Sequence, residues 1–143
     1  MTDLDQPDSL PSGLRLAVMR LARRLRQQSV GQVTASQHSA LATVGAKGPL
    51  SLGEMAAIEQ IAPPSMTRIA ARLEQMGLVE RQVDPADRRI ARLAITAAGA
   101  SLLEETRTRR DLYLARYVQR FTEQERAVLA AALPLLERLA SEE

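Results

Sequence analysis

The chain has 143 residues, of which 45% are hydrophobic and 2% aromatic, and its 19 basic and 17 acidic residues leave a formal net charge of +2. This length predicts one compact domain, and its core must be packed from aliphatic side chains and methionine. The sequence contains no cysteine, which excludes disulfides, thiolate metal sites, cysteine nucleophiles and oxidation sensing through a thiol.

Arginine carries nearly all of the positive charge, because Lys47 is the only lysine. A guanidinium group matches phosphates and guanine edges with a planar fork of donors, which suits contact with nucleic acid. A genomic bias toward arginine and alanine explains the same composition, and composition alone does not decide between the two.

The N-terminal segment, residues 1–11, carries three aspartates and few apolar anchors, which predicts a disordered extension. Its acidic, proline-broken sequence lacks the basic start and apolar run of a signal peptide. Apolar runs elsewhere fall short of the roughly 18 residues that a membrane span needs. We therefore expect a cytoplasmic protein that does not bind membranes.

Four helices are predicted before residue 78. The first begins near Ser12, with apolar residues at spacings of three and four. Capping-box patterns, TASQ at Thr34 and SLGE at Ser51, start two more, of which the first ends near GAKGP and the second is short. The prolines of PPSMTR open a fourth helix, which Gly77 ends.

A β-hairpin is predicted next, because LVERQV and IARLAI contain β-branched residues and flank the turn DPADRR. Thr96 then caps a long helix that extends to about Phe121. Thr122 opens a last helix, which Pro134 is expected to kink or to divide into two pieces.

This order of elements predicts a mainly α-helical protein with a small β-hairpin, in which residues 34–96 form a winged helix-turn-helix. The second helix of such a motif enters the major groove with its N-terminal residues at the base edges. Those residues here are Ser65, Met66, Thr67, Arg68 and Arg72. A solvent-exposed helix face with no ligand is the simpler alternative, which the neighbouring hairpin disfavours.

The hairpin turn places Arg88 and Arg89 at a tip that cannot pack inward. An arginine on a narrow projection can enter a minor groove, where narrow A·T tracts strengthen the negative potential. Asp87 can orient Arg89 by a charge-assisted hydrogen bond. Asp84, which precedes Pro85, is expected to bond backbone amides of the turn instead.

The stretch PSMTRIAARLEQMGLVERQVDPADRRIARLAITAAG resembles the MarR family of bacterial transcriptional regulators. It follows that family's pattern of a recognition helix, a glycine turn into LVER, a DPxDRR wing and an LxxT exit into a long helix. The resemblance implies that Ser65, Thr67 and Arg68 lie at the major groove and that Asp87 orients Arg89 in the minor groove. Ser51, at the start of the short helix, is expected to contact the DNA backbone.

The resemblance also implies a homodimer, in which residues 12–33 and 97–143 form an interleaved helical region. The sequence supports this expectation, because the first and last helices are apolar on more sides than one protomer can cover. The dimerisation residues predicted there are Leu10, Leu14, Leu129, Leu133 and Leu136. The alternative is the core of a monomer. Two-fold symmetry predicts a pseudo-palindromic operator with half-sites about 10 base pairs apart or a multiple of that.

A small aromatic or phenolic effector is expected from the resemblance alone, in a cleft lined by His38, Leu41 and Arg110. A lone histidine is more often a surface or interface residue than a ligand contact. The chain has one histidine, no glycine-rich phosphate loop and no cluster with metal-ligand spacing, so we expect neither an enzyme nor a cofactor or metal.

Together these patterns predict a homodimeric, sequence-specific regulator that binds double-stranded DNA, as a repressor of its own or neighbouring genes. The alternative is a winged-helix module that binds a protein and not DNA, because a fold does not fix a function.

Overall fold

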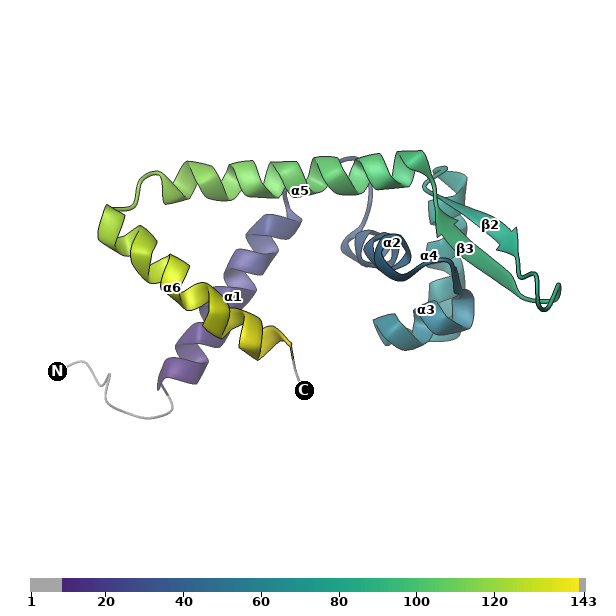
Figure 1. Cartoon of the computed structure of the whole chain (residues 1–143), viewed down its shortest axis with the longest axis horizontal. Helices are drawn as coiled ribbons and strands as arrows, with labels where there is room; N and C mark the ends of the chain where they lie inside the picture. The colour runs from purple at the N-terminus through teal and green to yellow at the C-terminus, as the bar shows by residue number, and fades with distance from the viewer. Residues whose placement is uncertain (1–8, 142–143) are drawn as a thin grey trace.

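The computed structural model describes residues 9–141 (Figure 1). Its elements in chain order are α1 (Ser9–Arg26), α2 (Ala35–Lys47), β1 (Leu50–Ser51), α3 (Leu52–Glu59), α4 (Pro63–Gln75), β2 (Val79–Val83), β3 (Ala91–Ile95), α5 (Ala97–Val118) and α6 (Glu123–Ala140). This order confirms the predicted fold class, a mainly helical protein with a small antiparallel sheet.

The first helix begins at Ser9, so the prediction of disorder to residue 11 was wrong for its last three residues. Pro11 lies in the first turn of α1, where the missing amide hydrogen leaves no intrahelical bond unmade. Residues 1–8 of the predicted extension lie outside the described residues.

The core lies where α2, α3 and α4 pack together against the sheet. Its largest fully buried apolar side chains are those of Leu41, Val44, Met55, Met66, Leu73 and Leu93. As the composition predicted, this core is aliphatic with methionine filling gaps. We call this part of the molecule, residues 34–96, the winged lobe.

The sheet has the order β1-β3-β2, with all pairs antiparallel. Val79 to Val83 pair in register with Ile95 to Ala91, and a turn of residues 84–90 joins the two strands. β1 was not predicted, because it spans only Leu50 and Ser51 and is too short to show an alternating pattern.

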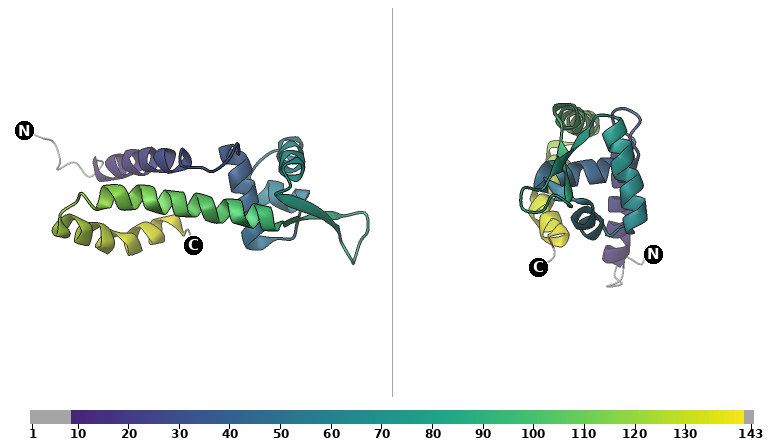
Figure 2. Two further views of the ribbon diagram at one scale, coloured as in Figure 1. Left: turned by 90° about the horizontal axis from the view of Figure 1, so that it is seen from above. Right: turned by 90° about the vertical axis from the view of Figure 1, so that its right-hand side faces the viewer.

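The long helix α5 runs from the winged lobe to the opposite end of the molecule, where α1 and α6 flank it (Figures 1 and 2). Three hydrogen bonds attach α1 and its following loop to α5, one of them from the Arg24 guanidinium to the Tyr113 hydroxyl at 3.4 Å. The Arg110 Nε donates to the carbonyl oxygen of Leu25 at 3.1 Å, and the hydroxyl of buried Thr106 accepts from the Val30 amide at 3.3 Å. The end of the molecule where α1 and α6 lie has no buried core of its own, because no described residue of either helix is buried.

The last helix is one continuous element with Pro134 inside it, so it is not divided into two pieces. Its N-terminus is capped as predicted, since the Thr122 hydroxyl accepts from the Glu125 amide. Across residues 9–141, none of the helices combines the length and the hydropathy needed to cross a membrane.

Candidate nucleic-acid interface

The helix α4 is held by its apolar face and leaves its polar face outward. Met66, Ala70 and Leu73 recur at spacings of four and three and are completely buried. Two prolines at the first helical positions preset the backbone, and Gly77, with a φ of 71°, turns the chain into β2. The turn before α4 passes through Gln60, whose φ of 53° lets α4 leave α3 at an angle.

Of the residues predicted to read bases, Thr67, Arg68 and Arg72 are exposed and Ser65 is half-buried. The Arg68 guanidinium lies 3.4 Å from the Ser65 hydroxyl. Arg68 and Arg72 are four residues apart, so both cations lie on one outward face of α4.

Met66 was wrongly placed among these residues. Its side chain is 0% exposed and belongs to the core. Its position, four residues before Ala70 and seven before Leu73, puts it on the apolar stripe of α4. The face of α4 available to a ligand therefore has one residue fewer than predicted.

Ser51 lies at the start of α3, on the same lobe. Its hydroxyl accepts a hydrogen bond from the Glu54 amide at 3.1 Å, which satisfies one of the free donors at the helix N-terminus. The remaining first-turn amides make this helix end favourable for an anion such as phosphate.

The wing tip holds Arg89 in one orientation. Its Nε lies 3.0 Å from Asp87 Oδ1 and its Nη2 lies 3.1 Å from Oδ2, which is a two-point ion pair. The Arg89 side chain is nevertheless 90% exposed. The guanidinium and the Arg89 amide hold the pKa of the Asp87 carboxyl below its usual value, so this pair is ionised at neutral pH.

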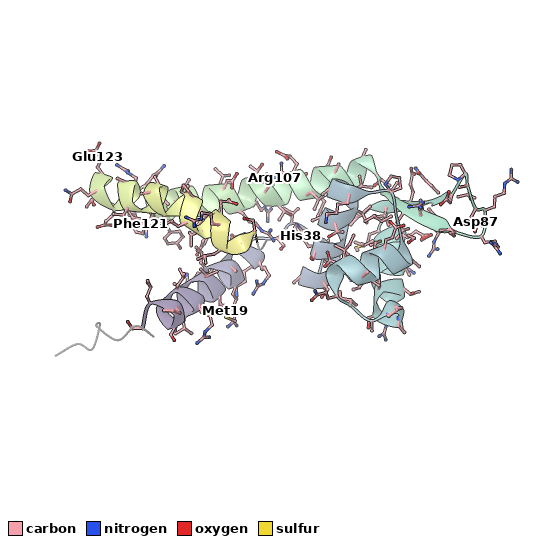
Figure 3. The ribbon with its side chains drawn as sticks, turned by 60° about the horizontal axis from the view of Figure 1, so that its bottom comes forward. Met19, His38, Asp87, Arg107, Phe121 and Glu123 are labelled. Atoms are coloured by element: carbon pink, nitrogen blue, oxygen red, sulfur yellow. The ribbon has the colours of Figure 1, made fainter. Side chains whose placement is uncertain are left out.

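The tip that carries Asp87 projects far from the helices (Figure 3). Arg88, beside it, is exposed as well. The hairpin thus presents two guanidinium groups on a narrow projection, with the direction of one fixed by its neighbour.

Asp84, at the root of the turn, makes the predicted turn contact, since its Oδ1 accepts from the Ala86 amide at 2.8 Å. It also binds a residue that the sequence did not single out: Oδ2 lies 2.9 Å from Arg92 Nε. These two partners, the Ala86 amide first, lower the pKa of the Asp84 carboxyl. Asp84 is therefore a buried, ionised residue with two roles at the base of the wing.

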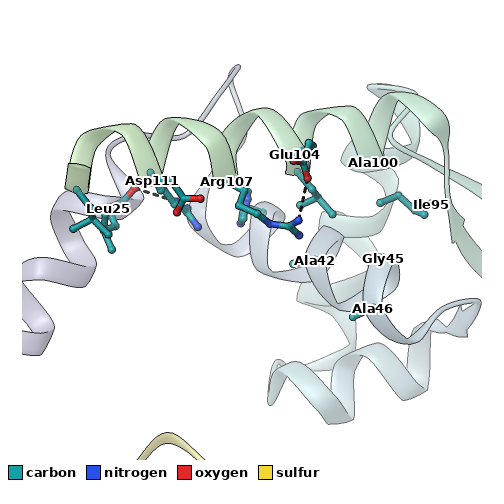
Figure 4. A pocket seen from close by; sticks show the side chains of 13 residues that line it. Leu25, Ala42, Gly45, Ala46, Ile95, Ala100, Glu104, Arg107 and Asp111 are labelled. Atoms are coloured by element: carbon teal, nitrogen blue, oxygen red, sulfur yellow. Dashed lines mark hydrogen bonds and ion pairs between the residues drawn. The ribbon is translucent and has the colours of Figure 1, made fainter. Parts of the chain in front are cut away.

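A cavity of about 670 Å³ lies between α2, α5 and the end of α1 (Figure 4). His38 and Arg110 are among the residues that line it. Arg107 also lines the cavity and forms an ion pair with Glu104 at 3.0 Å. The His38 Nε2 is buried without a hydrogen-bond partner in residues 9–141. Burial, and then the positive charge of Arg110, lower the pKa of His38, so the imidazole is neutral at pH 7.

The third residue predicted for this cavity, Leu41, was wrong. Leu41 is 0% exposed and belongs to the core of the winged lobe. On α2 the cavity is lined by His38, Ala42, Gly45 and Ala46, whereas Leu41 shares the buried face of the helix with Ala40 and Val44.

None of residues 9–141 covers the apolar face between α1 and α6. A groove of about 470 Å³ there is lined mainly by Leu14, Val18, Leu21, Leu133, Leu136 and Leu139. Leu10 is 75% exposed and Leu133 59%, and Leu129 and Leu136 are exposed too. All five residues predicted for dimerisation thus lie on these two helices, and none is buried within the protomer.

The short helix α3, the turn into α4 and the hairpin that follows define a winged helix-turn-helix protein. Comparison with known proteins agrees: the model of the MarR family matches residues 33–91. The HTH-type transcriptional regulator MT0903.1 of Mycobacterium tuberculosis is 39% identical over 97% of this chain and 98% of its own length. The chain belongs to the MarR family of winged helix-turn-helix transcriptional regulators.

Two further relatives extend this likeness. The HTH-type transcriptional repressor MdtR of Bacillus subtilis is 31% identical over 82% of this chain and 79% of its own length. A crystal structure of a transcriptional regulator protein from Pseudomonas aeruginosa superposes with a TM-score of 0.80 at 35% identity, covering 94% of this chain and 95% of that one. The similarity therefore includes the helices outside the winged lobe.

Proposed function

We propose that this regulator is a cytoplasmic homodimer that binds a pseudo-palindromic DNA operator and represses its own or neighbouring genes. The observation that carries the proposal is the Asp87–Arg89 pair, which holds an exposed guanidinium in one direction at the tip of the wing. An oriented arginine on a narrow projection suits the minor groove, where it loses little side-chain entropy on binding.

The helix α4 supports the same function from the other groove. Its outward face presents the guanidinium groups of Arg68 and Arg72 and the hydroxyl of Thr67, which donates to the Pro63 carbonyl oxygen at 3.0 Å and can still accept a hydrogen bond. A helix fits the major groove, and an arginine there can bind O6 and N7 of one guanine at once. In this arrangement α4 reads bases, Arg88 and Arg89 sense groove width, and Ser51 with the start of α3 contacts the backbone.

The uncovered leucines of α1 and α6 support the homodimer. A contiguous apolar surface of this kind marks an interface in soluble proteins. A two-fold dimer would place two copies of α4 about one helical turn of DNA apart. Repression is supported by the similarity to the transcriptional repressor MdtR, which aligns with 82% of this chain.

A mobility-shift assay with DNA from upstream of the chain's own gene tests the function directly. We expect a complex whose affinity falls steeply as salt rises, because arginine contacts to phosphates release counterions. Competition with unrelated DNA should leave the specific complex in place. Absence of salt-sensitive binding to every such fragment would refute the proposal.

Substitution of Arg68 on α4 and of Arg89 on the wing should affect DNA binding in different ways. Arg68→Ala should weaken operator binding by about 5- to 150-fold and relax the preference at one base pair of each half-site. Arg89→Ala should weaken binding about tenfold and act mainly on A·T-rich flanks with a narrow minor groove. Affinity measured by fluorescence anisotropy on operator variants separates the two effects.

Arg109→Ala is the matched control for both substitutions, because Arg109 is exposed on α5, outside the winged lobe, and carries the same charge. It should change affinity less than twofold, since exposed charges beyond a Debye length of about 8 Å are screened. If Arg109→Ala weakened binding as much as Arg89→Ala, the wing would have no specific part in recognition.

The cavity between α2 and α5 is proposed to take a small aromatic or phenolic anion that weakens DNA binding. Its apolar wall and the guanidinium of Arg107 support this, and His38, being neutral at pH 7, adds no charge there. A hydroxybenzoate probe should raise the melting temperature of wild type, since a ligand that binds the folded state stabilises it. Arg107→Leu should abolish this shift, and an equal shift in both proteins would refute the assignment.

A further inference from the structure

The strand residue Arg92 joins three parts of the winged lobe. Its Nε lies 2.9 Å from Asp84 Oδ2, and its Nη1 lies 3.2 Å from Glu54 Oε1. Asp84 is at the root of the wing turn, Glu54 is in the first turn of α3, and Arg92 itself is on the central strand β3. One guanidinium therefore connects the wing to the helix-turn-helix.

The Asp84 end of this bridge is firmly fixed. Besides Arg92, the carboxylate of Asp84 binds the Ala86 amide, and the Asp84 amide donates to the Ile90 carbonyl oxygen at 3.0 Å. These bonds close the turn that carries Asp87 and Arg89. A shift of the Arg92 guanidinium would therefore be passed on to the turn through a carboxylate that is only 11% exposed.

The bridge adds a polar connection between the sheet and α3 to the apolar packing of Leu93 and Met55 in the shared core. The strand that leads into α3, β1, consists of two residues, Leu50 paired with Leu93 and Ser51 paired with Arg92. So short a ladder contributes few backbone hydrogen bonds to fixing the angle between the hairpin and α3. Arg92 reaches across this joint from the position opposite Ser51 to Glu54, one helical turn into α3.

We propose that Arg92 is a positioning residue that fixes the angle of the wing relative to α3 and α4, so that Arg89 and α4 can engage adjacent grooves together. This inference rests on the proposed DNA-binding function. A competing explanation is that Arg92 binds a phosphate directly, since its side chain is 33% exposed. The two explanations predict opposite effects of removing Glu54.

Glu54→Ala raises the net charge by one and releases the Arg92 guanidinium from α3, while its ion pair with Asp84 remains. If Arg92 served only as a phosphate contact, this variant would bind DNA as tightly as wild type or more tightly. If Arg92 positions the wing, Glu54→Ala should weaken operator binding about fivefold. Glu80→Ala is the matched control, because Glu80 is exposed on β2, changes the charge equally and forms no ion pair within the described residues.

Combination with Arg89→Ala tests whether the loss acts through the wing. In wild type we expect Arg89→Ala to weaken binding about tenfold, but in the Glu54→Ala background only about twofold, because the wing no longer delivers Arg89 to its groove. Glu54→Gln keeps an oxygen that can accept from Arg92 and should restore most of the affinity. The proposal would be overturned if the free-energy effects of Glu54→Ala and Arg89→Ala were fully additive. It would also be overturned if Glu54→Ala bound the operator more tightly than wild type.

A measurement without DNA separates this inference from the proposed function. In ¹⁵N relaxation experiments, amides of residues 85–90 should show more fast motion in Glu54→Ala than in wild type or Glu80→Ala. The melting temperature should change little, because an ion pair this exposed adds little to stability. Unchanged motion would refute the positioning role, whether or not the protein binds the tested DNA.

Discussion

Replacing Leu133 and Leu136 together with aspartate should make the protein monomeric and weaken operator binding by about 10²- to 10⁴-fold, because the second half-site contact would cease to be intramolecular. Both leucines line the uncovered groove between α1 and α6. Neither belongs to the core of the winged lobe, so each protomer should keep its fold. Sedimentation velocity gives the oligomeric state, and anisotropy gives the affinity for a full operator and for a half-site.

The control for this variant adds the same two charges elsewhere. Ser101→Asp with Thr108→Asp places them at exposed positions of α5 that line neither cavity. This control should remain dimeric, with a modest loss of affinity from repulsion of phosphate that disappears at high salt. A dimeric leucine variant, or a monomer with full operator affinity, would contradict the proposed architecture.

The parts of the fold that local chemistry determines were predicted from the sequence. Thr34 and Thr96 cap helices as expected, because a side-chain oxygen satisfies an amide of the first turn. Gly77 adopts the positive φ that ends α4. The first residue of α1 was misplaced because residues 9–11 were grouped with the aspartate-rich segment before them, which has few apolar anchors, although a helix tolerates Pro11 in its first turn.

The candidate site was predicted less completely. Met66 and Leu41 were assigned by their place along a helix, whereas burial depends on the helix face, and both belong to the core. The role of Arg92 was not predicted, because its partners Asp84 and Glu54 lie 8 and 38 residues away in the sequence. The contact of Arg110 with Leu25 spans 85 residues and likewise leaves no local pattern.

Gly99→Ala should destabilise the protein by at least about 2 kcal/mol, because the added methyl group has no room. A Cβ at Gly99 would lie 2.2 Å from the carbonyl oxygen of Leu78 and 2.8 Å from Ile95 Cγ1. The Leu78 carbonyl cannot move aside cheaply, since it accepts from the Thr96 amide at 3.1 Å. Thr96 in turn donates its hydroxyl to the Gly77 carbonyl oxygen at 2.6 Å and caps α5, so displacement would loosen the exit from the hairpin.

Gly53→Ala provides a control of opposite sign, because a Cβ there would meet only Ser51 Oγ, at 3.9 Å. Alanine in a helix loses less backbone entropy on folding, so this variant should gain about 0.5–1 kcal/mol. Both values follow from urea denaturation at one fixed protein concentration, since unfolding of a dimer depends on concentration. If Gly99→Ala were as stable as wild type, α5 would not approach the start of β2 as closely as described. The long helix would then not pack against the hairpin at this point.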